Sequence, residues 1–172
     1  MSFSHSTKLW LFVSIPRQVV QIRAQENVLQ EFPVSTSVHG TGEQEGSLRT
    51  PTGWHHIAQK IGDGLPSGAI LKGRTFIGVV WEPGVAVAED PVLTRILWLA
   101  GDEEHNQNTF NRYIYFHGTH DEENIGQPLS HGCIRLRNSD MISLYNEAFE
   151  NMLVYLAKND EEPVWTPFLS AT

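Results

Sequence analysis

Short runs of apolar and β-branched residues, separated by polar turns, dominate the hydrophobic pattern of this chain. Runs of this length and composition are typical of β-strands that are buried on at least one face. Strands are therefore expected at residues 9–15, 18–24, 28–35, 54–60, 75–81, 94–100, 112–116 and 152–156. Glycine-rich stretches at residues 38–52 and 61–68, and a polar stretch at residues 101–109, are expected to be loops.

Only one segment, late in the chain, has the spacing of an amphipathic helix. Four of its residues recur at intervals that place them on one helical face: Met141, Leu144, Tyr145 and Ala148. Asn138 or Ser139 is expected to cap its first turn, because either side chain can accept from the free N–H groups there. Trp165 and Phe168 in the polar tail are expected to pack back onto the fold. The sequence therefore predicts a mainly β protein, a sandwich or barrel-like sheet with one short helix.

Length and charge narrow the class of protein. The chain has 172 residues, which suits a single domain spanning residues 1–172. Hydrophobic residues make up 40% and charged residues 19%, as in ordinary globular proteins. The net charge of -8, with scattered basic residues, argues against nucleic acid as a partner.

The N-terminal apolar run at residues 9–13 is too short for a signal peptide, and no cleavage site of small residues follows it. It continues into a second apolar run and is expected to begin the sheet. No stretch approaches the roughly 20 apolar residues of a membrane helix. A cytoplasmic protein is therefore expected, with a periplasmic or cell-wall location as the alternative if a leader has been trimmed.

The candidate chemistry centres on the only cysteine, Cys133. A free thiol is mostly protonated at neutral pH, and a nearby histidine can activate it by taking its proton. His131 lies two positions before Cys133, and His117 ends a predicted strand sixteen positions before it. If the intervening loop folds back, the strand of His117 can lie beside the segment of Cys133.

Two neighbours of the cysteine suggest how a substrate would be held. Gly132 has no Cβ, so it permits close approach of a substrate backbone. The N–H groups of Gly132 and Cys133 could form an oxyanion hole. Arg135 can offer paired donors to a substrate carboxylate, or it can simply pair with Asp140 or Glu122.

The sequence resembles the L,D-transpeptidase (YkuD-like) catalytic domain family. The family signature is a His-Gly pair, a gap of roughly fifteen residues, then Ser/Thr-His-Gly-Cys-apolar-Arg/Asn. It stands here as His117-Gly118 and as Ser130-His131-Gly132-Cys133-Ile134-Arg135. Earlier elements, at residues 32–36, 50–53 and 93–97, also look like the family, although Ser37 stands where glycine often follows Ser-Thr. The resemblance implies a YkuD-like fold with the helix near the active site.

The resemblance also implies a role for each matching residue. Cys133 is implied to attack the L,D-peptide bond of a peptidoglycan stem peptide, diaminopimelate–D-Ala, and to form a thioester. His117 is then the proton acceptor and donor, and the carbonyl of Gly118 orients its ring. His131 is a supporting residue of the pocket, and Ser130, Gly132 and Arg135 support the site or bind substrate. No cofactor or metal is implied, and carbapenem-type β-lactams are possible covalent inhibitors.

The fate of the acyl group is left open by the residues. A cytoplasmic location favours an L,D-carboxypeptidase that trims D-Ala from tetrapeptides during muropeptide recycling. The alternative is an L,D-transpeptidase that forms 3-3 cross-links or exchanges D-amino acids in the cell wall. A zinc hydrolase is a third interpretation, with donors at His117, His120, His131 and Cys133. An idle peptidoglycan-binding module is a fourth.

Overall fold

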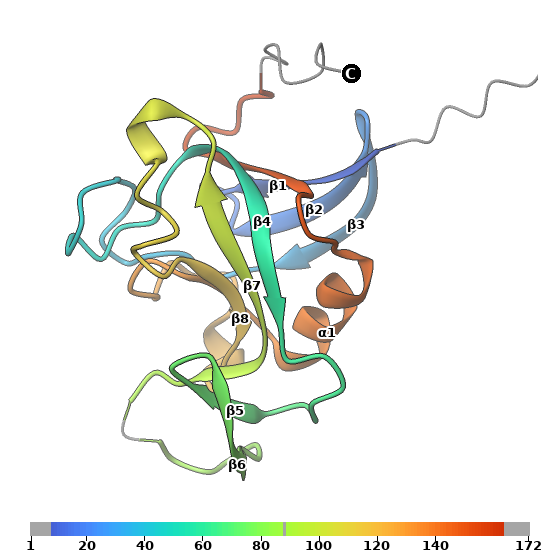
Figure 1. Ribbon diagram of the computed structural model, residues 1–172, viewed down its shortest axis with the longest axis vertical. Helices are drawn as coiled ribbons and strands as arrows, with labels where there is room; N and C mark the ends of the chain where they lie inside the picture. Colours follow the sequence, from blue (N-terminus) through green and yellow to red (C-terminus); the bar gives the residue numbers. More distant parts are fainter. Residues whose placement is uncertain (1–7, 88, 164–172) are drawn as a thin grey trace, which may run out of the picture.

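The computed structural model describes residues 8–87 and 89–163 (Figure 1). The predicted packing of Trp165 and Phe168 lies outside these described residues. The strands are β1 (Leu9–Ser14), β2 (Val19–Ala24), β3 (Asn27–Pro33), β4 (Gly53–Ile61), β5 (Ala69–Lys72), β6 (Thr75–Val80), β7 (Val92–Gly101), β8 (Tyr115–Gly118), β9 (Ile134–Leu136) and β10 (Leu153–Ala157). The helices are α1 (Asn138–Glu147) and two short 3-10 turns, η1 (Glu104–Asn106) and η2 (Glu122–Asn124).

The strands form one mixed, ten-stranded sheet in the order β3-β2-β1-β10-β4-β7-β5-β6, with β8 and β9 branching from β7. Most pairs are antiparallel, and the two parallel pairs are β1 with β10 and β8 with β9. The mainly β mixed sheet with one short helix confirms the predicted fold class. In the described part of the chain, no helix is long and apolar enough to cross a membrane.

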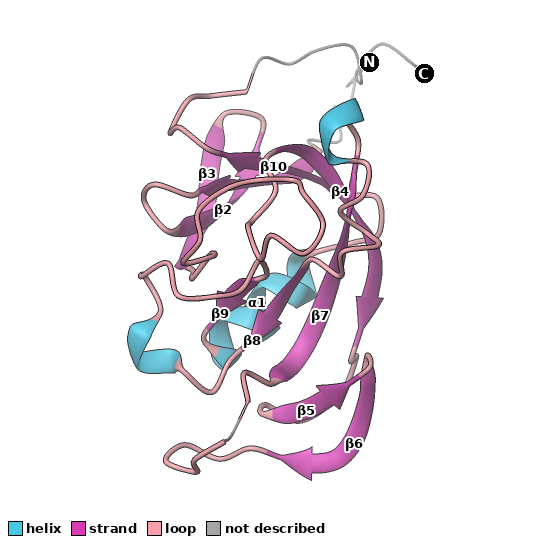
Figure 2. Ribbon diagram, turned by 90° about the vertical axis from the view of Figure 1, so that its left-hand side faces the viewer, coloured by secondary structure: helices cyan, strands magenta, loops and turns pink. Residues whose placement is uncertain are grey.

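The main hydrophobic core lies between the curled sheet and α1. The helix packs against β7 and β8 (Figure 2). Met141, Leu144 and Tyr145 on the predicted apolar face are buried there, against Phe116 of β8 and Leu136 of β9. Burying an apolar side chain of this size contributes about 1.5–3 kcal/mol, so this packing holds β8 and β9 firmly in place.

The start of α1 differs from the prediction. Neither Asn138 nor Ser139 caps the helix with its own side chain, because Asn138 is already the first helical residue. The carboxylate of Glu122 in η2 accepts from the Asn138 backbone N–H at 2.7 Å and from its amide Nδ2 at 2.8 Å. A carboxylate stabilises a helix N-terminus through its dipole as well as its free N–H groups. A residue far along the chain therefore replaces the expected local cap.

One strand was not predicted, and another begins later than predicted. The turn-rich region after residue 61 contains β5, which pairs with both β6 and β7. Its four residues, flanked by Pro66, Gly68 and Gly73, gave too short a signal for a strand. The strand expected at residues 112–116 starts only at Tyr115, because Tyr113 has a positive φ of 57°.

Candidate active site

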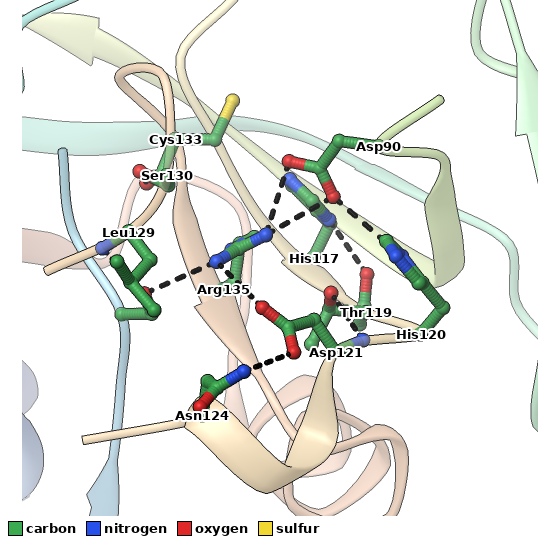
Figure 3. Close-up of polar contacts among 12 residues, drawn as sticks. Asp90, His117, Thr119, His120, Asp121, Asn124, Leu129, Ser130, Cys133 and Arg135 are labelled. Atoms are coloured by element: carbon green, nitrogen blue, oxygen red, sulfur yellow. Dashed lines mark hydrogen bonds and ion pairs between the residues drawn. The ribbon is translucent and has the colours of Figure 1, made fainter. Parts of the chain in front are cut away.

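Parallel pairing of β8 with β9 brings the predicted histidine and cysteine together. His117 lies opposite Arg135 in this register, and Phe116 lies opposite Ile134. Cys133 immediately precedes β9, and its sulfur contacts the backbone of Tyr115, two residues before His117. The strand of His117 therefore lies beside the cysteine segment, as the sequence suggested. Figure 3 shows both side chains with their polar neighbours.

The ring of His117 is buried and held in one orientation. It is only 3% exposed, and its Nδ1 lies 2.6 Å from the carbonyl oxygen of Gly118. A carbonyl oxygen can only accept a hydrogen bond, so Nδ1 carries the proton and Nε2 is left as the basic nitrogen. Burial lowers the pKa of His117, although the Gly118 carbonyl and the charge of Asp90 oppose this effect. The ring is therefore neutral at neutral pH.

Gly118 is required here by close packing and not by its backbone angles. A Cβ at this position would overlap Oδ1 of Asn138, and it would lie 3.0 Å from both the Leu93 carbonyl oxygen and Thr94 Oγ1. These neighbours are themselves fixed, since the Thr94 hydroxyl donates to Asn138 Oδ1 at 2.5 Å. Thr94 sits in a bulge of β7 with a positive φ of 74°, which is unusual for a β-branched residue. This strained bulge therefore helps to set the position of Gly118 and of the histidine beside it.

The thiol of Cys133 points toward the start of β8. Its sulfur accepts from the Tyr115 N–H at 3.4 Å and donates to the Tyr113 carbonyl at 3.4 Å. The residue keeps part of its surface exposed, yet the protein around the sulfur removes most of the water that would solvate a thiolate. This desolvation raises the pKa of the Cys133 thiol to about 11, although the Tyr115 N–H and Arg135 oppose it.

The two shifts together describe a neutral resting pair. A raised thiol pKa and a lowered histidine pKa both disfavour a preformed thiolate–imidazolium pair. Both groups are therefore neutral at neutral pH, and the thiol donates to the Tyr113 carbonyl.

The turn that leads to Cys133 is held by two hydroxyl groups. Ser130 Oγ donates to the Cys133 carbonyl at 2.6 Å and accepts from the Gly132 N–H at 3.3 Å. The buried Thr50 hydroxyl donates to the Gly132 carbonyl at 3.1 Å. Gly132 has a φ of +123°, a region that side chains rarely adopt, which explains glycine at this position. The long loop at residues 38–52 thus supports this turn directly.

One part of the expected oxyanion hole is altered by this turn. The Gly132 N–H already donates to Ser130, so it is not directed at a substrate. The Cys133 N–H, in contrast, makes no hydrogen bond to any residue that the structure describes. The backbone of Cys133 is therefore the donor that the geometry leaves for a developing oxyanion.

Arg135 has different partners from those considered in the sequence. Its guanidinium is buried, and it meets both carboxylate oxygens of Asp90 at 3.1 Å and one of Asp121 at 3.6 Å (Figure 3). The expected pairing with Asp140 or Glu122 is wrong, because the chain folds the loop of Asp90 over the arginine. Its donors are turned toward protein carboxylates, which leaves the predicted contact with a substrate carboxylate without support in the structure.

The remaining histidines of the motif region lie apart from one another. His131 is exposed, and its ring faces that of His39 at 6.1 Å between centroids. His120 lies 3.8 Å from Asp90. Among residues 8–87 and 89–163, no three histidine, cysteine or acidic side chains gather as a metal site would require. The zinc interpretation therefore lacks a ligand cluster within the described chain.

Several residues of the site were not found by sequence reasoning. Asp90 sits on a loop with no recognisable pattern, and only the folded chain brings it to Arg135 and His117. Asn138 was noted only as a cap, yet it packs against Gly118. Thr50 lies in one of the family-like elements, and that element was the available signal for its role.

Comparison with known proteins identifies the family of the chain. The family model of the L,D-transpeptidase catalytic domain (YkuD) matches residues 8–156. No curated protein matches the chain significantly in sequence.

Solved structures share the fold. An L,D-transpeptidase from Mycobacterium smegmatis is 16% identical with a TM-score of 0.54, over 87% of this chain and 58% of that one. A cysteine-to-serine mutant of the Enterococcus faecium L,D-transpeptidase is 17% identical with a TM-score of 0.53, over 87% and 50%. L,D-transpeptidase 3 from Mycobacterium tuberculosis, with a faropenem-derived adduct, is 15% identical with a TM-score of 0.54, over 86% and 59%.

This chain thus spans about half to three fifths of the length of these three solved chains. Identities this low establish the common fold, whereas the family match covers most of the present sequence and includes the histidine and cysteine segments. The chain therefore belongs to the L,D-transpeptidase catalytic domain family.

Proposed function

We propose that this protein is a cysteine acyl-transfer enzyme that cleaves the L,D-peptide bond of peptidoglycan tetrapeptides, between diaminopimelate and the terminal D-Ala. One observation carries the proposal: the His117 ring is fixed on the Gly118 carbonyl in a strand that pairs in parallel with the cysteine segment. The Gly118 contact leaves Nε2 as the basic nitrogen of a neutral imidazole, on a strand that lies beside the segment of the neutral Cys133 thiol, and acyl transfer needs a base and a thiol in neighbouring positions.

In the first half-reaction, the Cys133 sulfur attacks the carbonyl carbon while Nε2 of His117 takes the thiol proton. The oxygen becomes an anion and accepts a hydrogen bond from the Cys133 N–H. His117 then gives the proton to the amine of the D-residue, the C–N bond breaks and a thioester remains. In the second half-reaction His117 removes a proton from the acceptor, which attacks the thioester carbonyl carbon. The C–S bond then breaks, and His117 returns the proton to the departing sulfur, which regenerates the thiol.

The molecule that attacks the thioester decides the net reaction, and we propose that this acceptor is water. Hydrolysis makes the protein an L,D-carboxypeptidase that trims soluble tetrapeptides, as in cytoplasmic muropeptide recycling. The chain has a single cysteine and hence no internal disulfide, and a reducing compartment keeps that cysteine as the thiol the reaction needs. With an amine acceptor the same thioester would yield a 3-3 cross-link or an exchanged D-amino acid.

A β-lactam is the second class of acyl donor that we propose for Cys133. The Mycobacterium tuberculosis relative was solved with a faropenem-derived adduct. We expect a carbapenem to add its mass to this protein, with the β-lactam ring opened by the sulfur. The Cys133→Ala variant is expected to show no adduct, and an adduct on that variant would reject the assignment.

Mass spectrometry of a diaminopimelate-containing tetrapeptide, incubated with the protein with and without excess D-amino acid, tests the function. Conversion to tripeptide alone supports the carboxypeptidase, and the Cys133→Ala variant should abolish it. An exchanged tetrapeptide or a dimer would make the enzyme a transpeptidase. Turnover that survives in Cys133→Ala would refute the cysteine mechanism itself.

A further inference from the structure

An aromatic cluster stands beside the nucleophile. The ring of Trp98 in β7 stacks on Phe110 at 3.9 Å and meets Tyr115 edge-on at 5.4 Å. Tyr113 lies 5.7 Å from the same ring and is 52% exposed, so it carries the cluster to the surface. The Trp98 indole N–H donates to the Phe110 carbonyl at 3.0 Å, which holds the stack in place.

The backbone of two residues in this aromatic cluster contacts the Cys133 thiol. The two groups that contact the Cys133 sulfur, the Tyr115 N–H and the Tyr113 carbonyl, belong to residues of the aromatic cluster. Cys133 also packs against the buried apolar group that contains Trp98 and Tyr115. A ligand group bound on these rings therefore lies close to the reacting carbonyl.

Arg74 is placed on these rings by the turn between β5 and β6. Its guanidinium carbon lies 5.0 Å from the Trp98 ring centre and 5.1 Å from that of Tyr113. One of its N–H groups reaches the Tyr115 hydroxyl at 3.4 Å. Cation–π contacts on two rings hold the guanidinium in place and reduce the entropy lost when it binds a ligand. The remaining donors of the guanidinium fork have no carboxylate partner among the described residues.

The backbone at Arg74 is unfavourable for any residue except glycine, asparagine or aspartate. Gly73 and Arg74 have φ values of 52° and 64°, as a tight two-residue hairpin turn demands. A left-handed conformation costs an ordinary residue about 1 kcal/mol. Local turn geometry therefore favours asparagine or glycine at this position, and an arginine there needs another reason.

The charge around the thiol contrasts with that of the whole protein. The chain carries a net charge of -8, yet Arg112 also faces the thiol and lowers the pKa of Cys133. Its guanidinium is anchored by the carbonyls of Gly42 at 3.1 Å and Arg49 at 2.6 Å, which supply no full negative charge. Arg135, in contrast, is balanced by Asp90 and Asp121. Glu43 and Glu45 partly offset the charge of Arg112, whereas no acidic side chain that the structure describes acts on Arg74.

We propose that Arg74, mounted on Trp98 and Tyr113 and supported by the charge of Arg112, binds a carboxylate of the peptide next to the scissile bond. This inference rests on the proposed function. A peptide substrate offers two such carboxylates, the C-terminal one of the D-residue and the side-chain one of diaminopimelate. Either would form charge-assisted hydrogen bonds with the free edge of the fork, and the enzyme would disfavour the matching amide.

Three tetrapeptides test the inference: the free acid, the C-terminal amide and the diaminopimelate side-chain amide. We expect Arg74→Asn, which suits the turn, to lower kcat/KM on the free acid about tenfold or more. The same variant should not change kcat/KM for the amide in which the carboxylate bound by Arg74 has been replaced. The amide that is insensitive to Arg74→Asn therefore shows which of the two carboxylates Arg74 binds. Arg74→Lys should recover part of the loss because it keeps the charge but not the planar fork.

Lys72→Gln is the matched control, since Lys72 is an exposed cation on the same hairpin and does not contact the aromatic cluster. It should leave kcat/KM unchanged on all three peptides. Equal losses for Arg74→Asn and Lys72→Gln, or an equal effect of Arg74→Asn on all three peptides, would overturn the inference.

Binding separates failure of this inference from failure of the proposed function. Calorimetry would compare the free-acid peptide and its two amides on Cys133→Ala and on Cys133→Ala/Arg74→Asn. If the native enzyme turns over no peptide but the Arg74 change still weakens binding of the free acid about tenfold, the carboxylate site stands and the reaction is wrong. If the Arg74 change leaves the Kd of all three peptides unaltered, the carboxylate site is rejected whatever the turnover.

Discussion

The Nδ1 atom of His117 lies 2.6 Å from the carbonyl oxygen of Gly118, the residue that follows it in the chain. This local contact fixes both the proton position and the ring angle, and no acidic residue is needed for either. Burial keeps the ring neutral, so its Nε2 can accept a proton over a wide pH range.

The pH profile of kcat/KM should follow from these two groups. In the proposed mechanism His117 must be unprotonated to act. Burial lowers its pKa, so activity should rise with pH and reach half its maximum below the ordinary histidine value of 6.5. The Cys133 pKa of about 11 predicts no alkaline decline near pH 8 to 9. Initial rates at low substrate between pH 4 and 10 would check this. A bell-shaped profile centred near neutrality would instead indicate a thiolate–imidazolium pair.

Asp90 should tune this profile. Its negative charge raises the pKa of His117, so Asp90→Asn is expected to move the acidic limb to still lower pH. The same change leaves the buried Arg135 with weaker partners and should lower the free energy of unfolding by about 1–3 kcal/mol. Glu89→Gln removes the same charge from an exposed neighbour and serves as the control. An acidic limb that does not move in Asp90→Asn would show that this carboxylate does not act on the histidine.

Gly118→Ala should damage both stability and activity. The added Cβ would collide with Asn138 and press on the β7 backbone, and overpacking of this kind costs about 1–3 kcal/mol. The displaced carbonyl would also release the His117 ring. Urea unfolding with parallel kinetics measures both effects. Gly42→Ala is the comparison, because its new Cβ would meet only the flexible side chain of Arg49, and a change there as large as that of Gly118→Ala would contradict the packing argument.

His55 should make stability depend on pH away from the active site. It is fully buried between the Gly53 carbonyl and the Thr109 hydroxyl, and desolvation lowers its pKa from 6.5 to about 4. The unfolded chain therefore binds a proton more readily than the folded one between these values. The free energy of unfolding should fall by about 3 kcal/mol as pH drops from 6.5 toward 4. Denaturant titrations of the wild type and His55→Gln should show a flatter pH dependence in the variant, and parallel curves would rule out this residue as the source.

Much of the site could be predicted because its chemistry lies in contiguous residues. The segment from Ser130 to Arg135 and the pair His117-Gly118 were recognisable as units, and the parallel strand pairing brought the two units together as expected. The apolar spacing of α1 was likewise readable, since a helix face repeats at fixed intervals.

The missing parts depend on contacts between distant segments. Glu122 caps α1 and Asp90 pairs with Arg135, yet neither partner follows a local pattern. Thr50 lies in a family-like element, but its hydrogen bond to the carbonyl of Gly132 could not be predicted from that element. The four-residue strand β5 was also missed, because pairing with β6 and β7 stabilises it more than its own composition does. Tertiary hydrogen bonds of this kind appear only once the fold is known.

β8 carries His117, and Cys133 immediately precedes β9. Because these two strands pair in parallel, the relative position of the two residues does not depend on the length of the chain between them. Parallel neighbours cannot be connected by a tight hairpin, so the chain leaves β8, passes through η2 and returns to the start of β9. The register of the two strands, and not the number of residues in that return path, fixes how the histidine strand lies beside the cysteine segment. The part of the return path between Glu122, which caps α1, and Ser130, which holds the turn before Cys133, can therefore change in length over evolution while the two strands keep their register.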